Sequence, residues 1–311
     1  MKRINILLLG GSKRIALAKS FKSLNKFFKA KINLFTYDID PDVPFKKFGK
    51  VLIGKKWNDS KIFQDIRNKI KKYKLNIVIA NTDDSTLILS KLVQKYENLK
   101  FISSGVRATK LCMDKIKMHE FLKKTDIDLI PIEKNRPPIF IKPIKGSASI
   151  NSFKINNLKQ LKVLKSYLNS KDYIFQKFIS GTEYTVDVYI NKNRHMVGCV
   201  SRKRLKTSHG ESILTETSQN KKLSKIILKI IKHFNNELMG PLTFQFIKNK
   251  SKYYFLEINP RMSGGINASI SSGMNACKYV IFDTLYNKKN SDYNFKFKKM
   301  KMHKYFDEII I

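Results

Sequence analysis

The sequence predicts a protein of the α/β and α+β classes, in which a parallel sheet is followed by a mixed region with antiparallel strands. In the first hundred residues, short apolar runs alternate with amphipathic helical segments, which is the pattern of a parallel sheet with crossover helices. Beyond about residue 110, several apolar runs follow one another across short turns, which favours antiparallel pairing. The chain has 311 residues, enough for about two domains.

The N-terminal part alternates between predicted strands and predicted helices. Helices are expected over 59–73 and around 87–93, because apolar residues recur there at helical spacing. Gly10 and Gly11 end the first strand and Asp38 ends the second, as in a dinucleotide-binding turn. However, "GGSKRI" lacks the G-x-G-x-x-G spacing, so a Rossmann-like sheet without a cofactor is favoured. The five predicted strands are 4–10, 32–38, 51–54, 76–80 and 101–103.

The second part contains a short buried strand, "IFIK", which ends at Lys142 and is followed by a loop of small residues, 146–149. The clearest helix of the chain is predicted over 220–236, where apolar residues form one stripe. The runs "LTFQFIKN" and "KYYFLEIN" predict a β-hairpin. The other expected elements are an amphipathic helix over 158–168, two strands joined at Ser180-Gly181, and a strand in "HMVGCVSRKR".

The net charge is unusual, because 62 basic residues stand against 24 acidic ones, giving +38. Such an excess is typical of proteins that bind nucleic acid or anionic surfaces. Only nine of the basic residues are arginines, and the lysines are spread along the whole chain. Arginine is the usual reader of bases and phosphates, so a lysine-rich proteome explains the charge better. The charge should still attract anionic substrates such as nucleotides.

The cysteines and the apolar runs predict a cytoplasmic protein without a membrane span. Cys112, Cys199 and Cys277 are far apart and form neither a zinc pattern nor a disulfide framework, which suits a reducing compartment. No apolar run approaches the ~20 residues needed to cross a bilayer. The start, "MKRINILLLGGSKR", has glycines and basic residues where a signal peptide has its cleavage site, so it is interpreted as a first strand and turn.

A group of charged and amide side chains in the second part predicts phosphate and metal chemistry. Lys142 beside a small-residue loop, with Lys115 upstream, would neutralise phosphate oxygens. Gln245 and Glu257 lie on the two strands of the predicted hairpin and can face each other, with Asn259 next along. Their oxygens are the type that magnesium prefers alongside substrate phosphates. The set describes ATP-dependent phosphoryl transfer, and the motifs of P-loop proteins and protein kinases are absent from the sequence.

The order of motifs resembles that of ATP-grasp enzymes, closest to the carbamoyl-phosphate-synthetase-like branch, which includes the pyrrolysine-pathway amino-acid ligase and small carboxylate–amine ligases. The resemblance covers residues 1 to about 285. It implies a pre-ATP-grasp Rossmann-like domain over 1–108, a small subdomain with a phosphate flap over 109–180, and a C-terminal subdomain with metal and catalytic residues over 181–311. The motifs are "LLLGG", "YDIDPDVP", "NTDDSTL", "DKIKMHEFLKKTDI", "FIKPIKGSAS", "FQKFISGTEYTVDV", "FQFI" and "LEINPRMSGG".

The resemblance also implies a role for each site residue, with ATP and two magnesium ions bound and manganese as an acceptable substitute. The lysines Lys115 and Lys142 would hold the phosphates, under a flap that includes Gly146 and Ser147. Arg261 would stabilise the acyl phosphate and the tetrahedral intermediate. The metal ligands would be Gln245, Glu257 and Asn259. The adenosine contacts would come from Gln176, Lys177, Phe178, Ile179 and Glu183.

The substrate side is less determined by the sequence. Arg202, Arg204 and His209 could hold a carboxylate, although a solvated basic strand explains them equally well. Gly264 and Gly265 would let a substrate approach the backbone closely. The expected function is ligation of a small-molecule carboxylate to an amine, with no specific nucleic-acid partner and with a homodimer as the assembly common in the family. The alternative is an ATP-grasp fold used as a binding module for nucleic acid or an anionic polymer.

Overall fold

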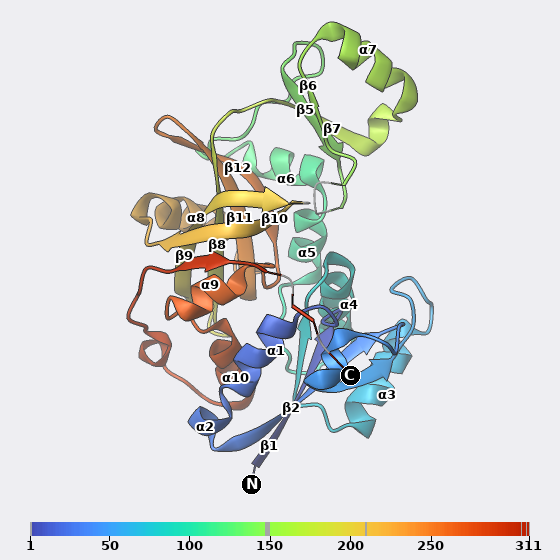
Figure 1. Ribbon diagram of the computed structural model, residues 1–311, viewed down its shortest axis with the longest axis vertical. Helices are drawn as coiled ribbons and strands as arrows, with labels where there is room; N and C mark the ends of the chain where they lie inside the picture. The colour runs from blue at the N-terminus through green and yellow to red at the C-terminus, as the bar shows by residue number, and fades with distance from the viewer. Residues whose placement is uncertain (1, 147–149, 209, 306, 309, 311) are drawn as a thin grey trace.

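A computed structural model describes residues 2–146, 150–208, 210–305, 307–308 and 310. The described chain contains three sheets, which follow one another along the long axis of the molecule (Figure 1). The sheet formed by the N-terminal part is at one end, the largest sheet is in the middle, and a small sheet with one covering helix projects at the other end. The expected domain boundary at 180/181 falls between the small and the large sheet, and the one at 108/109 falls inside a helix; both remain predictions.

The N-terminal sheet has four parallel strands in the order β3-β2-β1-β4, as the alternating pattern predicts. Helices cover both of its faces (Figure 1). Its strands are β1 (Lys2–Leu9), β2 (Ala30–Asp38), β3 (Lys50–Ile53) and β4 (Ile77–Ala80). Its helices are α1 (Ile15–Lys22), α2 (Asn25–Phe28), α3 (Ile62–Lys72) and α4 (Asp83–Lys95), with a 3-10 turn at Pro44–Lys47.

The fifth strand predicted at 101–103 is wrong, because these residues have no regular structure. The polar groups that follow are bonded to another segment instead of a sheet. Ser104 Oγ donates to the Met239 carbonyl oxygen and accepts from the Met239 N–H, and the Gly105 N–H donates to the Glu237 carbonyl oxygen. Phe101 is buried in the core, so the apolar character of this run reflects burial of its side chain and not strand formation.

The small sheet has β5 (Ile139–Pro143) between β6 (Phe153–Ile155) and β7 (Tyr173–Lys177), all antiparallel. Helix α7 (Leu158–Tyr167) packs against it through Leu161 and Leu164. Two helices, α5 (Val106–Cys112) and α6 (Lys115–Leu122), lead from the N-terminal part to this sheet. A 3-10 turn at Ser170–Asp172 precedes β7.

The large sheet has six antiparallel strands in the order β12-β11-β8-β9-β10-β13. The predicted hairpin is confirmed as β11 (Gly240–Asn249) and β12 (Lys252–Asn259), and Gln245 is paired with Glu257. Strands β10 and β13 were not predicted. The remaining strands are β8 (Thr182–Ile190), β9 (Met196–Ser208), β10 (Glu211–Ser218) and β13 (Lys301–His303). The helices are α8 (Lys221–His233), α9 (Ile266–Ser271) and α10 (Ala276–Leu285), with a 3-10 turn at Asn290–Tyr293.

One hydrophobic cluster joins the N-terminal sheet to α10, far along the sequence. It contains Ile4 and Ile6 of β1, Phe21 of α1, and Val280 and Phe282 of α10, all buried. A second cluster covers the other face of the N-terminal sheet with α3 and α4, and a third packs α5, α6 and α8 against the large sheet. The N-terminal sheet therefore shares its core with the last helix of the chain.

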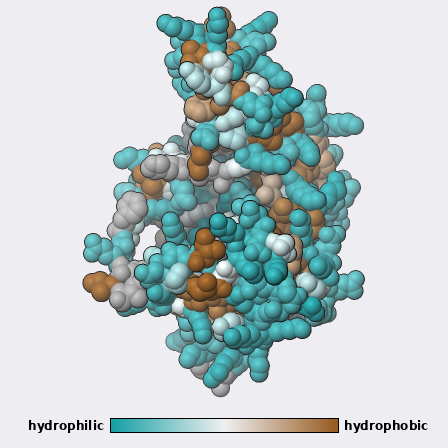
Figure 2. Space-filling view, turned by 90° about the vertical axis from the view of Figure 1, so that its right-hand side faces the viewer, coloured by the Kyte–Doolittle hydropathy of each residue, from teal (hydrophilic) through white to brown (hydrophobic). Residues whose placement is uncertain are grey.

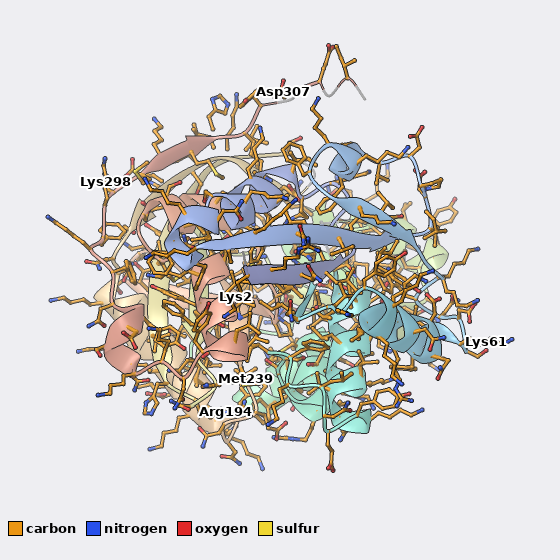
Figure 3. The ribbon with its side chains drawn as sticks, turned by 90° about the horizontal axis from the view of Figure 1, so that it is seen from below. Lys2, Lys61, Arg194, Met239, Lys298 and Asp307 are labelled. Carbon is orange, nitrogen blue, oxygen red and sulfur yellow. The ribbon has the colours of Figure 1, made fainter. Side chains whose placement is uncertain are left out.

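The surface is hydrophilic over most of the face in Figure 2. Nitrogen-tipped side chains project on all sides of the view in Figure 3, which agrees with lysines spread along the sequence. Among the described residues, no helix has both the length and the apolar character needed to cross a membrane.

A buried ion pair connects β8, β9 and α9. Asp187 is fully buried and accepts hydrogen bonds from Arg202 Nε at 2.7 Å and Arg202 Nη2 at 3.3 Å. Its carboxylate also accepts from Ser263 Oγ at 2.7 Å and Ser269 Oγ at 2.6 Å. These bonds compensate for the loss of water around both charges.

We expect Asp187→Ala to lower the free energy of unfolding by about 3–5 kcal/mol, because it leaves the Arg202 guanidinium buried without its counter-charge. Urea denaturation measures this change. Asp126→Ala is the matched control, because Asp126 pairs with Lys229 at the exposed surface and its loss should leave the free energy of unfolding nearly unchanged. A loss below about 1 kcal/mol for Asp187→Ala would contradict the role of the pair.

Candidate active site

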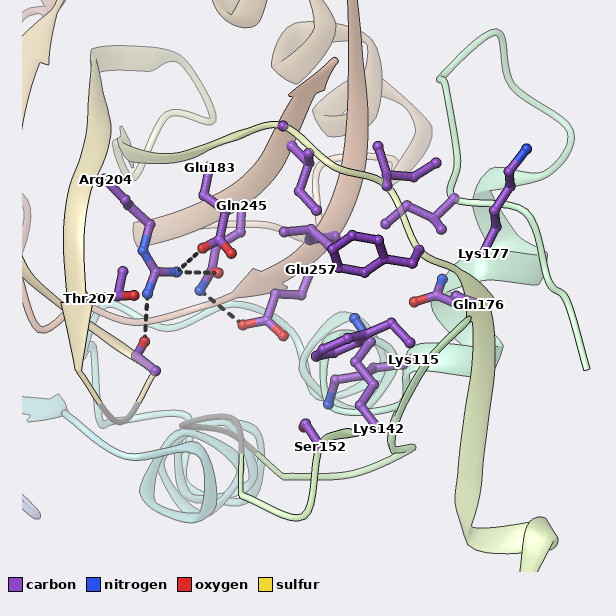
Figure 4. Close-up of a pocket in the computed structure, with 18 of the residues that line it drawn as sticks. Lys115, Lys142, Ser152, Gln176, Lys177, Glu183, Arg204, Thr207, Gln245 and Glu257 are labelled. Atoms are coloured by element: carbon purple, nitrogen blue, oxygen red, sulfur yellow. Dashed lines mark hydrogen bonds and ion pairs between the residues drawn. The ribbon is translucent and has the colours of Figure 1, made fainter. Parts of the chain in front are cut away.

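A cavity of about 370 Å³ lies between the small sheet and the large sheet. Figure 4 shows its charged and polar side chains, with Lys115 and Lys142 near Glu257, and Gln245 and Glu183 beyond it. The residues come from α6, β5, β7, β8, β11 and β12, so no single segment of the chain forms the site.

Lys142 lies near the end of β5 and is only 8% exposed. Burial lowers the pKa of Lys142 to about 8, while the Glu257 carboxylate acts in the opposite direction and Lys115 adds to the lowering. Lys115 begins α6, and its Nζ donates to the Gly146 carbonyl oxygen at 2.8 Å. Gly146 has a φ of +114°, which favours glycine at this point of the loop. Because no carboxylate of the described residues forms an ion pair with it, the buried Lys142 ammonium is suited to receive an anionic group.

The other end of the cavity is formed by the end of β7. Gln176 is buried there, and Phe178 and Ile179 follow it along the cavity wall. The Lys177 N–H already donates to the Pro131 carbonyl oxygen and the Phe178 N–H to that of Pro138. These two N–H groups are therefore not available to a ligand, and the Gln176 side-chain amide is the polar side-chain group that lines this end of the cavity.

Arg204 joins the polar side chains at the centre of the site. Its Nη1 lies 3.0 Å from Glu183 Oε2 and donates to Gln245 Oε1 at 3.2 Å. Its Nη2 donates to the Gly210 carbonyl oxygen at 2.7 Å. The dashed lines in Figure 4 mark these interactions. Arg204, predicted as a substrate ligand, lines this cavity and also a second, smaller cavity that adjoins it and is described below.

Gln245, Glu257 and Asn259 are brought together as the sequence predicts. Glu257 Oε1 accepts from Gln245 Nε2 at 3.0 Å and from Asn259 Nδ2 at 2.9 Å. A register shift opposite Gln245 and Phe246 makes this possible. Phe255 is buried, and strict alternation along β12 would place Glu257 on the same buried face. The register shift is a β-bulge, which turns the Glu257 side chain to the cavity and leaves Ile258 in the core.

A second cavity, of about 140 Å³, adjoins the first and is lined by Arg261, Gly264 and Gly265. Arg261 Nε donates to Asp83 Oδ1 of α4 at 2.6 Å, a partner that the sequence motifs do not indicate. Arg202 reaches this cavity only at one edge, because its guanidinium is paired with Asp187. A Cβ on Gly265 would lie 2.5 Å from Arg202 Nη1, so glycine is required at this close approach.

Two predicted site residues, Ser147 and His209, lie outside the described residues. The other predicted residues line the two cavities. The sequence did not single out Glu211 and Ser263, which also line the second cavity, or Asp83, which pairs with Arg261. Asp83 belongs to "NTDDS", so its position in a motif was visible, but its pairing with a residue 178 positions away was not.

Comparison with known proteins identifies the fold. A family described as "ATP-grasp in the biosynthetic pathway with Ter operon" matches residues 169–305. The N5-carboxyaminoimidazole synthetase of Staphylococcus aureus, solved with ADP, superposes with a TM-score of 0.72 at 18% identity, covering 93% of this chain and 80% of that one. The chain therefore has the fold of this synthetase, and its residues 169–305 match an ATP-grasp family model.

Two further solved structures and one curated protein are also similar to this chain. Biotin carboxylase of Campylobacter jejuni, solved with a β-γ-ATP ligand, has a TM-score of 0.72 at 17% identity over 96% of this chain and 74% of its own. The L-amino acid ligase of Bacillus licheniformis has a TM-score of 0.68 at 16% identity over 94% and 76%. A curated carbamoyl-phosphate synthase of Methanobrevibacter smithii is 21% identical over 215 residues, which is 60% of this chain and 57% of that protein.

We expect the Lys142 ammonium to titrate with a midpoint near pH 8 in the ligand-free protein. Carbon-13 NMR of ε-labelled lysines measures this, and Lys142→Met assigns the signal by removing it. Glu257→Gln should move the midpoint to a lower pH, because it removes a negative charge that stabilises the protonated form. A midpoint that stays the same or rises in Glu257→Gln would show that the two groups do not interact across the cavity.

Proposed function

We propose that the protein is an ATP-dependent carboxylate–amine ligase that forms an acyl phosphate and then an amide bond, releasing ADP and phosphate. The observation that supports this most is the arrangement of Lys115 and Lys142 across one cavity from Gln245 and Glu257, with Asn259 bonded to Glu257. Cationic groups on one side and oxygen donors on the other are what a nucleotide triphosphate and its metal require.

ATP would lie along the first cavity. Its phosphates would meet the Lys115 and Lys142 ammonium groups, and Gly146 would bring the loop backbone close to them. Its adenine would lie against the end of β7, at Gln176 and the backbone of Lys177, Phe178 and Ile179. The ribose hydroxyls would donate to Glu183, whose carboxylate is held by Arg204 at 3.0 Å.

The oxygen donors fit magnesium. One carboxylate and two amide groups meet at Glu257, and rotation of each amide exchanges its NH₂ and oxygen positions. Within the described residues there is no cluster of three or more His, Cys, Asp or Glu side chains that could form a protein-only metal cage. A set of this kind suits an ion that is shared with substrate phosphates. Two bound ions, with Glu257 shared between them, would neutralise the phosphate charge.

The chemistry would proceed in two steps. A carboxylate oxygen of the acid attacks the γ-phosphorus of ATP, the bond to the bridging oxygen breaks, and ADP leaves. The amine nitrogen then attacks the carbonyl carbon of the acyl phosphate, phosphate leaves, and the nitrogen loses a proton. Arg261 lies next to the oxygen donors in the second cavity, and its guanidinium would stabilise the negative charge that develops on the oxygens. Similar structures include a protein named as an L-amino acid ligase.

The alternative, a binding module for nucleic acid or an anionic polymer, has less support. It predicts lysines gathered on one face, and nitrogen-tipped side chains project on all sides of Figure 3. The buried Lys142 and the Glu257 group face an internal cavity instead of an extended surface.

We expect Lys142→Ala to weaken ATP binding by about 1.5–3 kcal/mol, because a charge-assisted hydrogen bond to phosphate is lost. Titration calorimetry measures the affinity, and the exposed Lys171→Ala is the matched control. Wild-type affinity should also fall as the pH rises above about 8, because neutral Lys142 no longer attracts the phosphates. Unchanged affinity in Lys142→Ala would remove the basis for the proposed phosphate site.

Glu257 and Arg261 should act on different parts of the reaction. Glu257→Gln removes the only full negative charge of the oxygen-donor set, so acyl-phosphate formation should be lost. Arg261→Ala should leave ATP affinity nearly unchanged and reduce turnover by roughly 10²–10³-fold, the usual loss for one oxyanion-stabilising group. Arg261→Lys should recover only part of it, because a point charge does not reproduce the planar guanidinium.

The measurements are ATP affinity and single-turnover acyl-phosphate formation for each variant. Loss of ATP binding in Arg261→Ala, or full turnover in Glu257→Gln, would show that the two roles are assigned wrongly.

A further inference from the structure

A third cavity, of about 600 Å³, lies between the N-terminal sheet and the loop that follows β12. Its walls include the turn after β1, the end of β2, and the segment after β3. It shares Glu211, Arg261 and Gly264 with the second cavity, so the two are adjacent at the proposed catalytic arginine. It is large enough for a second small molecule beside the nucleotide.

Arg14 is a partly buried guanidinium in the wall of this cavity. Its Nη2 donates to the Ser263 carbonyl oxygen at 2.6 Å. No carboxylate of the described residues lies within ion-pair distance of Arg14, although Arg261 is close enough to repel it. Burial, and next the charge of Arg261, lower the pKa of Arg14 to about 10. Arg261 is paired with Asp83, which lines the same cavity, so Arg14 is the one of the two guanidinium groups without a carboxylate partner among the described residues. It is suited to bind an anion from a ligand beside Arg261.

Asp38, at the end of β2, is one of the carboxylates that line the same cavity, with Asp40, Asp83 and Glu211. Asp83 is paired with Arg261, and Glu211 with Lys304. The Asp38 carboxylate accepts from the Ser12 hydroxyl and from the Asp40 N–H at 3.1 Å. Within the described part of the chain, no Lys, Arg or His nitrogen pairs with it. Asp38 and Arg14 therefore line one cavity, carry opposite charges, and do not pair with each other. A molecule with an anionic and a cationic group could satisfy both.

The cavity also has an aromatic wall, formed by Tyr37 and Trp57. Their rings are stacked with centroids 5.6 Å apart. Tyr37 is buried, and its hydroxyl donates to Asp65 and accepts from the Lys55 N–H, so the ring is held in place. Trp57 is partly exposed in the cavity wall and is the only tryptophan in the sequence. Its fluorescence therefore reports on the surroundings of a residue in the wall of this cavity.

We propose that this cavity binds the carboxylate substrate and that the substrate is a free amino acid, with its carboxylate between Arg14 and Arg261 and its ammonium at Asp38. The proposal rests on the proposed ligase function and adds the substrate class and two residues of the N-terminal part that select it. Arg14 positions the carboxylate beside Arg261, where the γ-phosphate of ATP would meet it. Asp38 distinguishes an amino acid from a simple carboxylic acid.

The experiment is a titration of Trp57 fluorescence with each standard L-amino acid and with its deaminated counterpart, such as propionate for alanine. At least one amino acid should give a saturable change, and its deaminated counterpart should bind about 10- to 100-fold more weakly, as expected for the loss of one charge-assisted bond. Arg14→Gln should weaken the amino acid by a similar factor. Asp38→Asn should remove the preference over the deaminated acid. Arg3→Gln, an exposed arginine of the same part of the chain, should change neither.

The outcomes separate this inference from the proposed function. Circular dichroism shows whether Arg14→Gln folds. If it does not fold, Arg14→Lys and Asp38→Asn test the proposed amino-acid site instead. The inference is overturned if no amino acid changes the fluorescence, if deaminated acids bind equally well, or if only acids without an amino group support ATP-dependent phosphate release. In that last case the ligase function stands. Absence of ATP binding by calorimetry would instead overturn the ligase function, whereas selective amino-acid binding at Trp57 would still support the site.

Discussion

The buried carboxylate of Asp187 is the constraint on which the second cavity depends. It accepts hydrogen bonds from β9, from the loop after β12 and from α9. These bonds fix Ser263, and the fixed loop places Arg261 on one side and Gly264-Gly265 on the other. A buried carboxylate is stable only when its hydrogen-bond donors are correctly placed. The Asp187 carboxylate therefore holds the walls of the second cavity rigid, although Asp187 does not itself line that cavity.

The first cavity depends on a different electrostatic balance. Burial removes water from the Lys142 ammonium and destabilises its charged form. The negative charge of Glu257 across the cavity compensates only partly for this loss. Glu257 in turn accepts two amide hydrogen bonds while its second oxygen faces the cavity. Each side is therefore incompletely satisfied in the protein alone, which is the condition under which a polyanion and a metal bind with little rearrangement of the walls.

The sequence predicts the fold well where the pattern is local. The parallel sheet and the hairpin follow from periodicity alone, whereas the facing of Gln245 and Glu257 also needs the bulge in β12. The failures are non-local. The run at 101–103 is apolar because Phe101 is buried, and its neighbours bond to residues near 238, which no local pattern reveals. The bulge in β12 has the same origin, because Phe255 and Glu257 have the same parity and only pairing with β11 separates them.

The site was predictable in its residue types but not in its partners. The lysines, the oxygen donors and Arg261 stand in recognisable motifs. The pairs Arg261–Asp83 and Arg202–Asp187, and the position of Arg14 at Ser263, join segments that lie far apart in the sequence. Such contacts depend on how the N-terminal sheet packs against the C-terminal strands, which motif order cannot give.

The shared core between β1 and α10 has a consequence for synthesis. Ile4 and Ile6 of the first strand pack in one cluster with Val280 and Phe282 of the last helix. The last strand of the N-terminal sheet ends at Ala80, but α10 begins only at Ala276. One apolar face of the sheet therefore stays partly uncovered until α10 has been synthesised. At translation rates of roughly 5–20 residues per second, that interval lasts on the order of 10–40 s. During that interval, the nascent chain exposes the apolar face of its N-terminal sheet that α10 later covers.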